Sequence, residues 1–152
     1  MIHLILLRPE IPQNTGNVGR LCSYADCSLH LIGPYGFEIS DSRLRRAGMD
    51  YWHSLRLFEY SSWESFLDSG DRPERIHLFT TKADRSLWDV EFQSEDGLLF
   101  GNESSGVPPE VHQWASGNRV KIPQFQDGLR SLNLANATAV AAYEALRQIN
   151  CG

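Results

Sequence analysis

Three segments of this sequence combine glycines with asparagine, glutamate, serine and arginine, residue types that bind and position polar ligands. They cover residues 8–21, 98–109 and 122–142. Each follows an apolar run and leads into a stretch with helical character. Free N–H groups at the start of a helix attract phosphate, and glycine allows the backbone to approach a ligand closely. We therefore expect the three segments to form one site that handles a nucleotide.

The first segment carries two polar residues that could act in such a site, Asn14 and Arg20. Asn14 and Thr15 can cap a helix that runs to about residue 25. We expect Arg20 on the second turn of that helix, facing back toward the loop, where it could hold a phosphate. The alternative is an ordinary capped helix with a surface arginine.

The second and third segments carry Glu103, Ser131 and Asn133. Glu103 stands between Gly101 and Gly106, in a loop where its carboxylate can accept hydrogen bonds from a ligand or a neighbouring arginine. Ser131 and Asn133 precede an alanine-rich helix that can pack closely against another backbone. Taken singly, each segment could also be a plain connection from a strand to a capped helix.

Apolar runs and helical periodicity alternate along the chain. Strands are predicted at residues 2–7, 29–32, 55–58, 76–80, 98–100 and 119–122, and helices at 14–25, 40–47, 62–67, from 108, and at 132–149. This alternation predicts an α/β fold in which a mostly parallel sheet is flanked by helices, formed by residues 1–152 as a single domain. Such sheets bind ligands outside the carboxyl ends of their strands, and all three segments leave a predicted strand at that edge.

Composition narrows the class of protein. The 152 residues include no apolar run that could span a bilayer, no signal peptide, and three cysteines without a CxxC pair. These features indicate a reduced, cytoplasmic protein without a metal site. Neither GxGxxG nor GxxxxGK(S/T) occurs, which excludes an ordinary Rossmann enzyme and a P-loop NTPase. The net charge of −5 counts against RNA as a partner, but Arg43, Arg45 and Arg46 form a local basic cluster.

The histidines fit packing roles better than catalytic ones. His3, His30 and His77 alternate with apolar residues on predicted strands, so we expect them to pack inside the sheet. His53 stands beside Trp52 and could touch RNA. None of the histidines has the spacing from a cysteine that a metal site needs.

Taken together, the three segments resemble the signature motifs of the SpoU branch of the SPOUT methyltransferases. The motifs stand here as Asn14 to Arg20, Phe100-Gly-Asn-Glu-Ser-Ser-Gly106 and Ser131-Leu-Asn-Leu-Ala-Asn136. The likeness covers essentially the whole chain. Its further parts look like the small single-domain members that methylate the wobble nucleotide of tRNA, at residues 9–17, 43–51 and 143–148.

The resemblance implies a fold, a cofactor and an assembly. In this family the C-terminal part of the sheet carries a deep trefoil knot, within which S-adenosylmethionine binds. The family works as a homodimer whose active site is completed across the interface, usually by the last helix and the first motif. By motif position, the cofactor contacts correspond to Phe79, Thr80, Gly101, Ile122, Ser131 and Leu132.

The implied reaction moves a methyl group from a sulfonium to the ribose 2′-hydroxyl of the C or U at position 34 of tRNA. In the family, the residue at Arg20 is proposed to act on the hydroxyl proton. Because arginine stays protonated in proteins, we expect Arg20 to bind phosphate and orient the hydroxyl. Asn14, Glu103, Ser131 and Asn133 would hold this arrangement. The expected RNA contacts are Arg43, Arg45, Arg46, Arg130 and Tyr143.

Two departures from the family pattern leave other functions open. The wobble-methylating members usually have proline where Asn102 stands and often arginine where Ser105 stands. An asparagine before the glutamate is more typical of SpoU-type enzymes that act on another tRNA or ribosomal RNA position, which is the alternative enzyme function. A third interpretation is a non-catalytic RNA-binding factor on the same fold. Arg20, Glu103 and the motif glycines are all present, which favours an enzyme.

Overall fold

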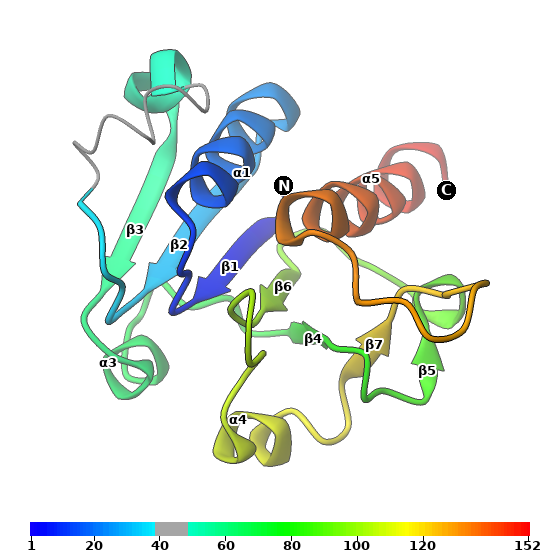
Figure 1. Cartoon of the computed structure of the whole chain (residues 1–152). Helices are drawn as coiled ribbons and strands as arrows, with labels where there is room; N and C mark the ends of the chain where they lie inside the picture. The colour runs from blue at the N-terminus through cyan, green and yellow to red at the C-terminus, as the bar shows by residue number, and fades with distance from the viewer. Residues whose placement is uncertain (39–48) are drawn as a thin grey trace.

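Seven parallel strands form one sheet at the centre of the molecule (Figure 1). The structure is a computed structural model that describes residues 1–38 and 49–152. The strands are ordered β3-β2-β1-β6-β4-β7-β5, and each neighbouring pair is parallel. The predicted parallel α/β sheet is therefore confirmed. The bounds are β1 His3–Leu7, β2 Ser28–Ile32, β3 Arg56–Tyr60, β4 Ile76–Phe79, β5 Arg85–Ser86, β6 Gly97–Phe100 and β7 Arg119–Lys121.

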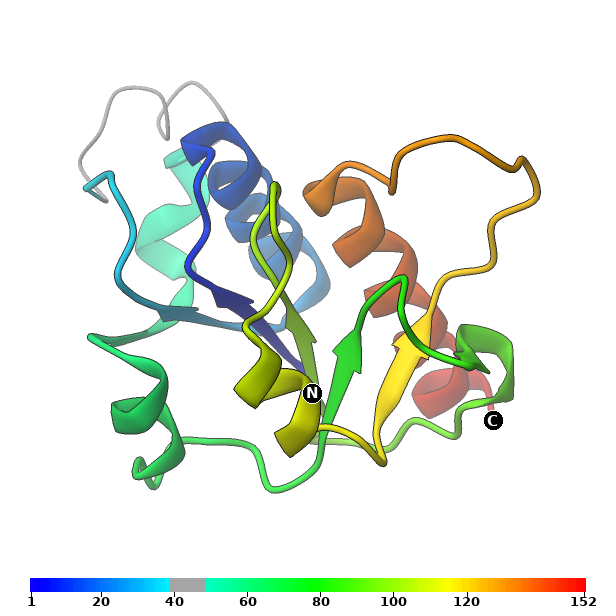
Figure 2. The same cartoon turned by 60° about the horizontal axis from the view of Figure 1, so that its bottom comes forward.

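Helices cover both faces of the sheet (Figure 2). On one face α1 (Pro12–Ala25) packs beside α5 (Leu134–Cys151), and the shorter α3 (Trp63–Leu67) and α4 (Pro109–Trp114) lie on the other. The described residues also form two 3-10 helices, η1 (Met49–Ser54) and η2 (Leu87–Asp89). Within residues 1–38 and 49–152, none of the helices could span a membrane.

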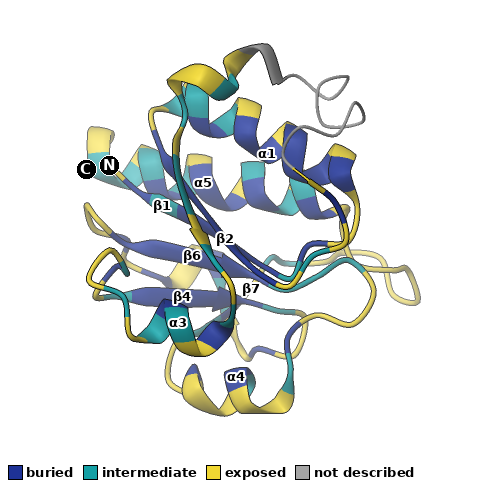
Figure 3. Ribbon diagram, turned by 90° about the vertical axis from the view of Figure 1, so that its left-hand side faces the viewer, coloured by how far each residue is buried: buried dark blue, intermediate teal, exposed yellow. Residues whose placement is uncertain are grey.

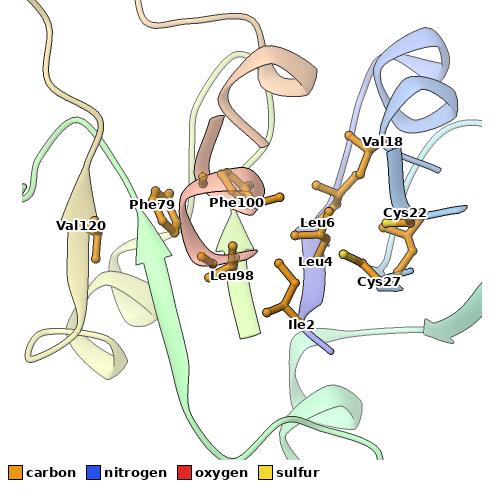
Figure 4. Packing of buried hydrophobic residues seen from close by; sticks show 14 of the residues in the cluster. Ile2, Leu4, Leu6, Val18, Cys22, Cys27, Phe79, Leu98, Phe100 and Val120 are labelled. Carbon is orange, nitrogen blue, oxygen red and sulfur yellow. The ribbon is translucent and has the colours of Figure 1, made fainter. Parts of the chain in front are cut away.

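Each face of the sheet has its own hydrophobic core, because successive residues of a strand point to opposite sides. The central strand β1 sends Leu4 and Leu6 into the core beneath α1 and α5 (Figure 4). It sends Ile5 and Leu7 into the core beneath α3 and α4. Figure 3 shows that the central strands are buried along their length. This double burial explains why the first strand is continuously apolar in the sequence.

Most predicted elements are present in the structure. All six predicted strands are found, whereas β5 was missed because two residues are too few to show a periodicity. The predicted cap of α3 is confirmed, since the Ser62 hydroxyl accepts a hydrogen bond from the Ser65 N–H at 3.1 Å. The helix predicted at residues 40–47 lies outside the described residues.

The start of α1 differs from the prediction. The helix begins at Pro12, after Ile11 in the N-cap position, so the predicted cap at Asn14 and Thr15 is wrong. Proline suits the first turn because it lacks an N–H that would go unpaired there and its φ is already helical. Asn14 and Thr15 are instead buried inside the first turns of the helix.

The last helix, α5, is held in place by contacts with two other parts of the chain. It packs against α1, and Gln148 links it to the segment that precedes β6. The Gln148 amide donates to the Val90 carbonyl at 3.0 Å and accepts from the Phe92 N–H at 2.9 Å. This position agrees with the trefoil knot that the family resemblance implies, and the knot itself stays a prediction.

A fully buried histidine joins the strands on one side of the sheet. His30 on β2 lies 3.0 Å from the Nδ1 of His3 on β1 and 2.9 Å from the hydroxyl of Tyr60 on β3. Its ring stacks on Phe58 with the centroids 4.7 Å apart. The expectation that His3, His30 and His77 pack inside the sheet is confirmed for His30 and His77, which are buried. His3 is half-buried and lies 3.0 Å from the carboxylate of Glu95.

Replacing His30 with glutamine is expected to weaken the dependence of stability on pH. Burial, and then the neighbouring His3, lower the pKa of His30 to about 3, whereas an unfolded histidine has a pKa of about 6.5. The contribution to stability is therefore complete above pH ~6.5 and is lost as the pH falls toward 3. Between pH 7 and pH 5 the loss is about 2 kcal/mol, which urea unfolding at the two pH values measures.

The matched control is His53→Gln, which removes an exposed histidine. This variant should keep the wild-type difference between the two pH values. The His30→Gln variant should reduce this difference by about 2 kcal/mol, the part that His30 contributes. An equal difference in wild type and His30→Gln would show that His30 does not control the pH dependence.

Candidate functional site

A cavity of about 840 Å³ opens at the carboxyl ends of the central strands. Its walls come from the loops that follow β1, β4, β6 and β7, the edge at which such sheets bind ligands. The volume lies within the range of pockets that hold small ligands. The three segments singled out in the sequence therefore meet at one site. All six predicted cofactor contacts line this cavity, namely Phe79, Thr80, Gly101, Ile122, Ser131 and Leu132.

The carboxylate of Glu103 joins the second loop to the first. Its two oxygens accept the N–H of Glu10 at 2.9 Å and the N–H of Ile11 at 2.7 Å. The side-chain amide of Asn14 donates to the same carboxylate at 3.2 Å. Since Ile11 is the N-cap of α1 and has no side-chain cap of its own, the negative charge lies where the helix dipole stabilises it.

The amide of Asn14 extends this connection to the third loop. Its oxygen accepts a hydrogen bond from the side-chain amide of Asn133 at 3.0 Å. The oxygen of Asn133 in turn caps α5 by accepting the N–H groups of Ala135 and Asn136. A buried side chain, Asn14, therefore uses both its donor and its acceptor to connect the starts of the two long helices.

The second loop is a closed turn that requires glycine at Gly101. The backbones of Asn102 and Gly106 exchange two hydrogen bonds, at 3.0 and 3.2 Å, and Gly106 has a φ of 69°. A Cβ on Gly101 would lie only 2.3 Å from the carbonyl carbon of Gly106. The Asn102 side chain shapes the same turn by accepting the N–H and the hydroxyl of Ser105, at 2.8 and 2.9 Å. Asparagine and serine at these positions therefore act as a pair.

The third loop forms an open, largely apolar wall of the cavity. Phe125 and Leu132 line the cavity and are 82% and 52% exposed. The ring of Phe125 lies 6.0 Å from that of Trp88. The side chain of Gln124 donates to the carbonyls of Gln126 and Leu129, which fixes the bend of the loop. The loop therefore presents an apolar surface that a bound molecule could cover.

Arg20 is not among the residues that line the cavity. It is exposed on the third turn of α1, where its guanidinium lies 5.3 Å from the ring centre of Tyr51. The predicted position on the second turn is wrong, because the helix begins at Pro12 rather than after Asn14. The guanidinium makes no hydrogen bond to the part of the chain that the structure describes.

Some of the other predicted site residues line the cavity and some do not. Asn14, Glu103, Ser131 and Asn133 line the cavity, as does Arg130. Tyr143 is 47% exposed on α5 and is not part of the lining. The basic cluster of Arg43, Arg45 and Arg46 lies outside the described residues.

Two lining residues, Lys82 and His112, were not predicted from the sequence. Lys82 follows β4 at the same edge of the sheet, so its place after a predicted strand was a usable signal. His112 comes from α4, and only the packing of that helix brings it to the cavity. Burial, with the charges of Lys82 and Arg119, lowers the pKa of His112. Among residues 1–38 and 49–152 there is no cluster of three His, Cys, Asp or Glu side chains that could hold a metal ion.

Known proteins match this chain over nearly its full length. Residues 1–143 match the model of the SpoU rRNA Methylase family. A tRNA (cytidine(34)-2'-O)-methyltransferase from Polaromonas sp. is 42% identical over 150 residues, which is 97% of this chain and 91% of that protein. A protein with the same name from Yersinia pestis is 42% identical over 154 residues, which covers 98% of this chain and 94% of the relative.

Solved structures agree in fold as well as in sequence. A structure that concerns the 2-OH methylation of C/U34 on tRNA is 46% identical, with a TM-score of 0.91 over 97% of this chain and 95% of that one. An AdoMet-bound rRNA methyltransferase from Sinorhizobium meliloti is 26% identical, with a TM-score of 0.85 over 96% of this chain and 56% of its own. On these matches in sequence and fold, the chain belongs to the SpoU rRNA methylase family.

Proposed function

We propose that this protein transfers the methyl group of S-adenosylmethionine to the ribose 2′-hydroxyl of nucleotide 34, C or U, in the tRNA anticodon loop. The observation that carries the proposal is the single cavity on which the three motif loops converge. Relatives that are 42% identical over almost the whole chain are named for this reaction. The proposal treats residues 1–152 as one domain, supported by the one sheet that contains every described strand.

The cavity residues fit S-adenosylmethionine as the cofactor. The approach of Gly101 to Gly106 leaves backbone rather than side chain in the cavity wall. Leu132 and Ile122 offer apolar surface suited to an adenine ring, and Ser131 adds a hydroxyl. A related methyltransferase structure holds AdoMet. When bound, the cofactor would supply a methyl group on a positively charged sulfur.

In the proposed mechanism, the protein's main contribution is position. Methyl transfer discharges the sulfonium, so the reaction gains more from alignment of the hydroxyl than from stabilisation of a new anion. Glu103, Asn14 and Asn133 would keep the three loops at fixed distances around the reacting atoms. Arg20 remains protonated, so it would bind an RNA phosphate and orient the 2′-hydroxyl. The proton of that hydroxyl would pass to the RNA phosphate or to water rather than to Arg20.

We further propose that the active protein is a homodimer in which Arg20 serves the cavity of the partner subunit. Arg20 is exposed on α1 and lies outside the cavity of its own chain. The neighbouring helix α5 exposes Val140 and Tyr143, at 44% and 47%. Apolar side chains on this helix suit an interface between two copies. In this arrangement Tyr143 would belong to the interface between the subunits, and RNA would contact Arg130 at the cavity.

A second candidate is ribose methylation at another position of tRNA or ribosomal RNA. The observation that favours it is the turn in which Asn102 accepts hydrogen bonds from Ser105. Proline and arginine, the residues more usual in wobble-methylating members, could not form this pair. The hydrogen bonds inside the second loop would therefore differ between this chain and those members.

Mass spectrometry of nuclease-digested tRNA should distinguish the two functions. Cells that lack the protein are expected to lose 2′-O-methylation at nucleotide 34, because the proposed reaction is the step that adds this methyl group. Expression of the wild-type chain should restore the modification. Loss of a ribose methyl at another tRNA or ribosomal RNA position would support the second candidate. Unchanged methylation of all RNA would contradict both.

The Arg20→Ala variant is expected to lose methyl transfer while it keeps its affinity for S-adenosylmethionine. Removal of one group that acts in the transition state typically lowers kcat about 100-fold or more. Steady-state kinetics with tRNA and calorimetry with the cofactor measure the two effects separately. Arg56→Ala is the control. Arg56 forms an ion pair with Asp26 at 2.7 Å, and neither residue lines the cavity. Wild-type turnover by Arg20→Ala would remove Arg20 from the mechanism.

The Gly101→Ala variant is expected to weaken cofactor binding by about tenfold or more. Its new methyl group must push the Gly106 backbone out of the cavity wall, and overpacking of this kind typically costs about 1–3 kcal/mol. Gly117→Ala is the matched control, because a Cβ at Gly117 meets nothing within 4 Å. Calorimetry that gave both variants the wild-type dissociation constant would show that this turn does not hold the cofactor.

A further inference from the structure

Four basic residues gather near the cavity on the side of the sheet that carries α4, and we call them the α4-side patch. They are Lys82, His112, Arg119 and Lys121. Figure 1 shows α4 on the opposite face of the sheet from α1 and α5, close to β4 and β7. The proposed reaction gives these residues no role.

The backbone of β7 determines where two of them point. Val120 packs into the core beneath α5, so its neighbours Arg119 and Lys121 point to the opposite face. Arg119 is the register partner of Leu78, which packs in the core with Val111 of α4. Arg119 and Lys121 therefore share the face that α4 covers.

The other two residues connect the patch to the cavity. Lys82 and His112 both belong to the cavity lining. The Nδ1 atom of His112 is buried and has no hydrogen-bond partner among the described residues. The patch therefore extends from the cavity wall outward to the edge of the sheet.

Among the residues that the structure describes, no acidic side chain pairs with Lys82, Arg119 or Lys121. Within residues 1–38 and 49–152, Lys82, Arg119 and Lys121 form neither an ion pair nor a side-chain hydrogen bond. Lys82 and Arg119 lie near enough to His112 for their charges to lower its pKa, after burial. The chain has 19 acidic side chains and 14 lysines and arginines. A group of cations without acidic partners is therefore unusual for a chain in which acidic side chains outnumber basic ones.

We propose that the α4-side patch binds the phosphate backbone of the RNA substrate next to the cavity, a role that rests on the proposed function. Arginine and lysine that lack protein partners are suited to phosphate, and the arginine fork can bind it in a bidentate manner. Phosphate contacts set the register of an RNA without reading its bases. In the proposed dimer the Arg20 that serves this cavity comes from the other subunit, so the patch would add a phosphate contact from the subunit that holds the cavity.

The test is the salt dependence of tRNA binding by the full chain, with Arg119→Gln, Lys121→Gln and the double variant. Each phosphate contact contributes about 0.7–0.9 to the slope of log affinity against log salt concentration. The double variant should lower the slope by about 1.4–1.8 and weaken tRNA binding about tenfold in 0.1 M salt. Its affinity for S-adenosylmethionine should stay within about twofold of wild type. Glutamine keeps the apolar stems of both side chains, and urea midpoints confirm folding.

The control is Arg56→Gln, which removes a positive charge from β3 at the opposite edge of the sheet and should keep the wild-type slope. A wild-type slope in the double variant would overturn the proposal. A wild-type salt dependence of tRNA binding together with weaker binding of S-adenosylmethionine would also overturn it. That result would mean that the patch binds the carboxylate of the cofactor instead of RNA. If the wild type binds tRNA but methylates no RNA, the proposed function fails, and the slopes still decide the role of the patch.

Discussion

The carboxylate of Glu103 holds together two distant parts of the chain. Its hydrogen bond to the N–H of Glu10 joins residues that are 93 positions apart in the sequence. Hydrogen bonds to a charged group contribute about 1.5–3 kcal/mol each, more than bonds between neutral groups. Glu103 accepts two of them from the loop that enters α1 and one from Asn14 in the first turn of that helix. This negative charge therefore fixes the first loop against the second, and the shape of the cavity depends on it.

Asn14 carries the same constraint to the third loop. Its amide donates to Glu103 and accepts from Asn133, which caps α5. Since Asn14 is buried, loss of either partner would leave a buried polar group unsatisfied. The two long helices thus begin at positions that depend on each other. A reaction that relies on alignment needs this kind of fixed frame.

Charge is distributed so that an acidic chain can handle RNA. The net charge is −5, and much of the basic character is local. Arg20 lies on α1, Arg130 at the cavity, and the α4-side patch on the other face of the sheet. In the proposed dimer, Arg20 of one subunit and the α4-side patch of the other would contact the same RNA at one cavity.

The sequence by itself determined the order of most strands and helices along the chain, the edge that carries the site, and the three loops that build it, because apolar periodicity and glycine placement are local properties. Only the tertiary structure decided the contacts between these loops. The hydrogen bonds of Glu103 and Asn14 join residues distant in the chain, and no local pattern records them. The same is true of Arg20, which is not part of the cavity lining, and of His112, which the packing of α4 brings to the cavity wall.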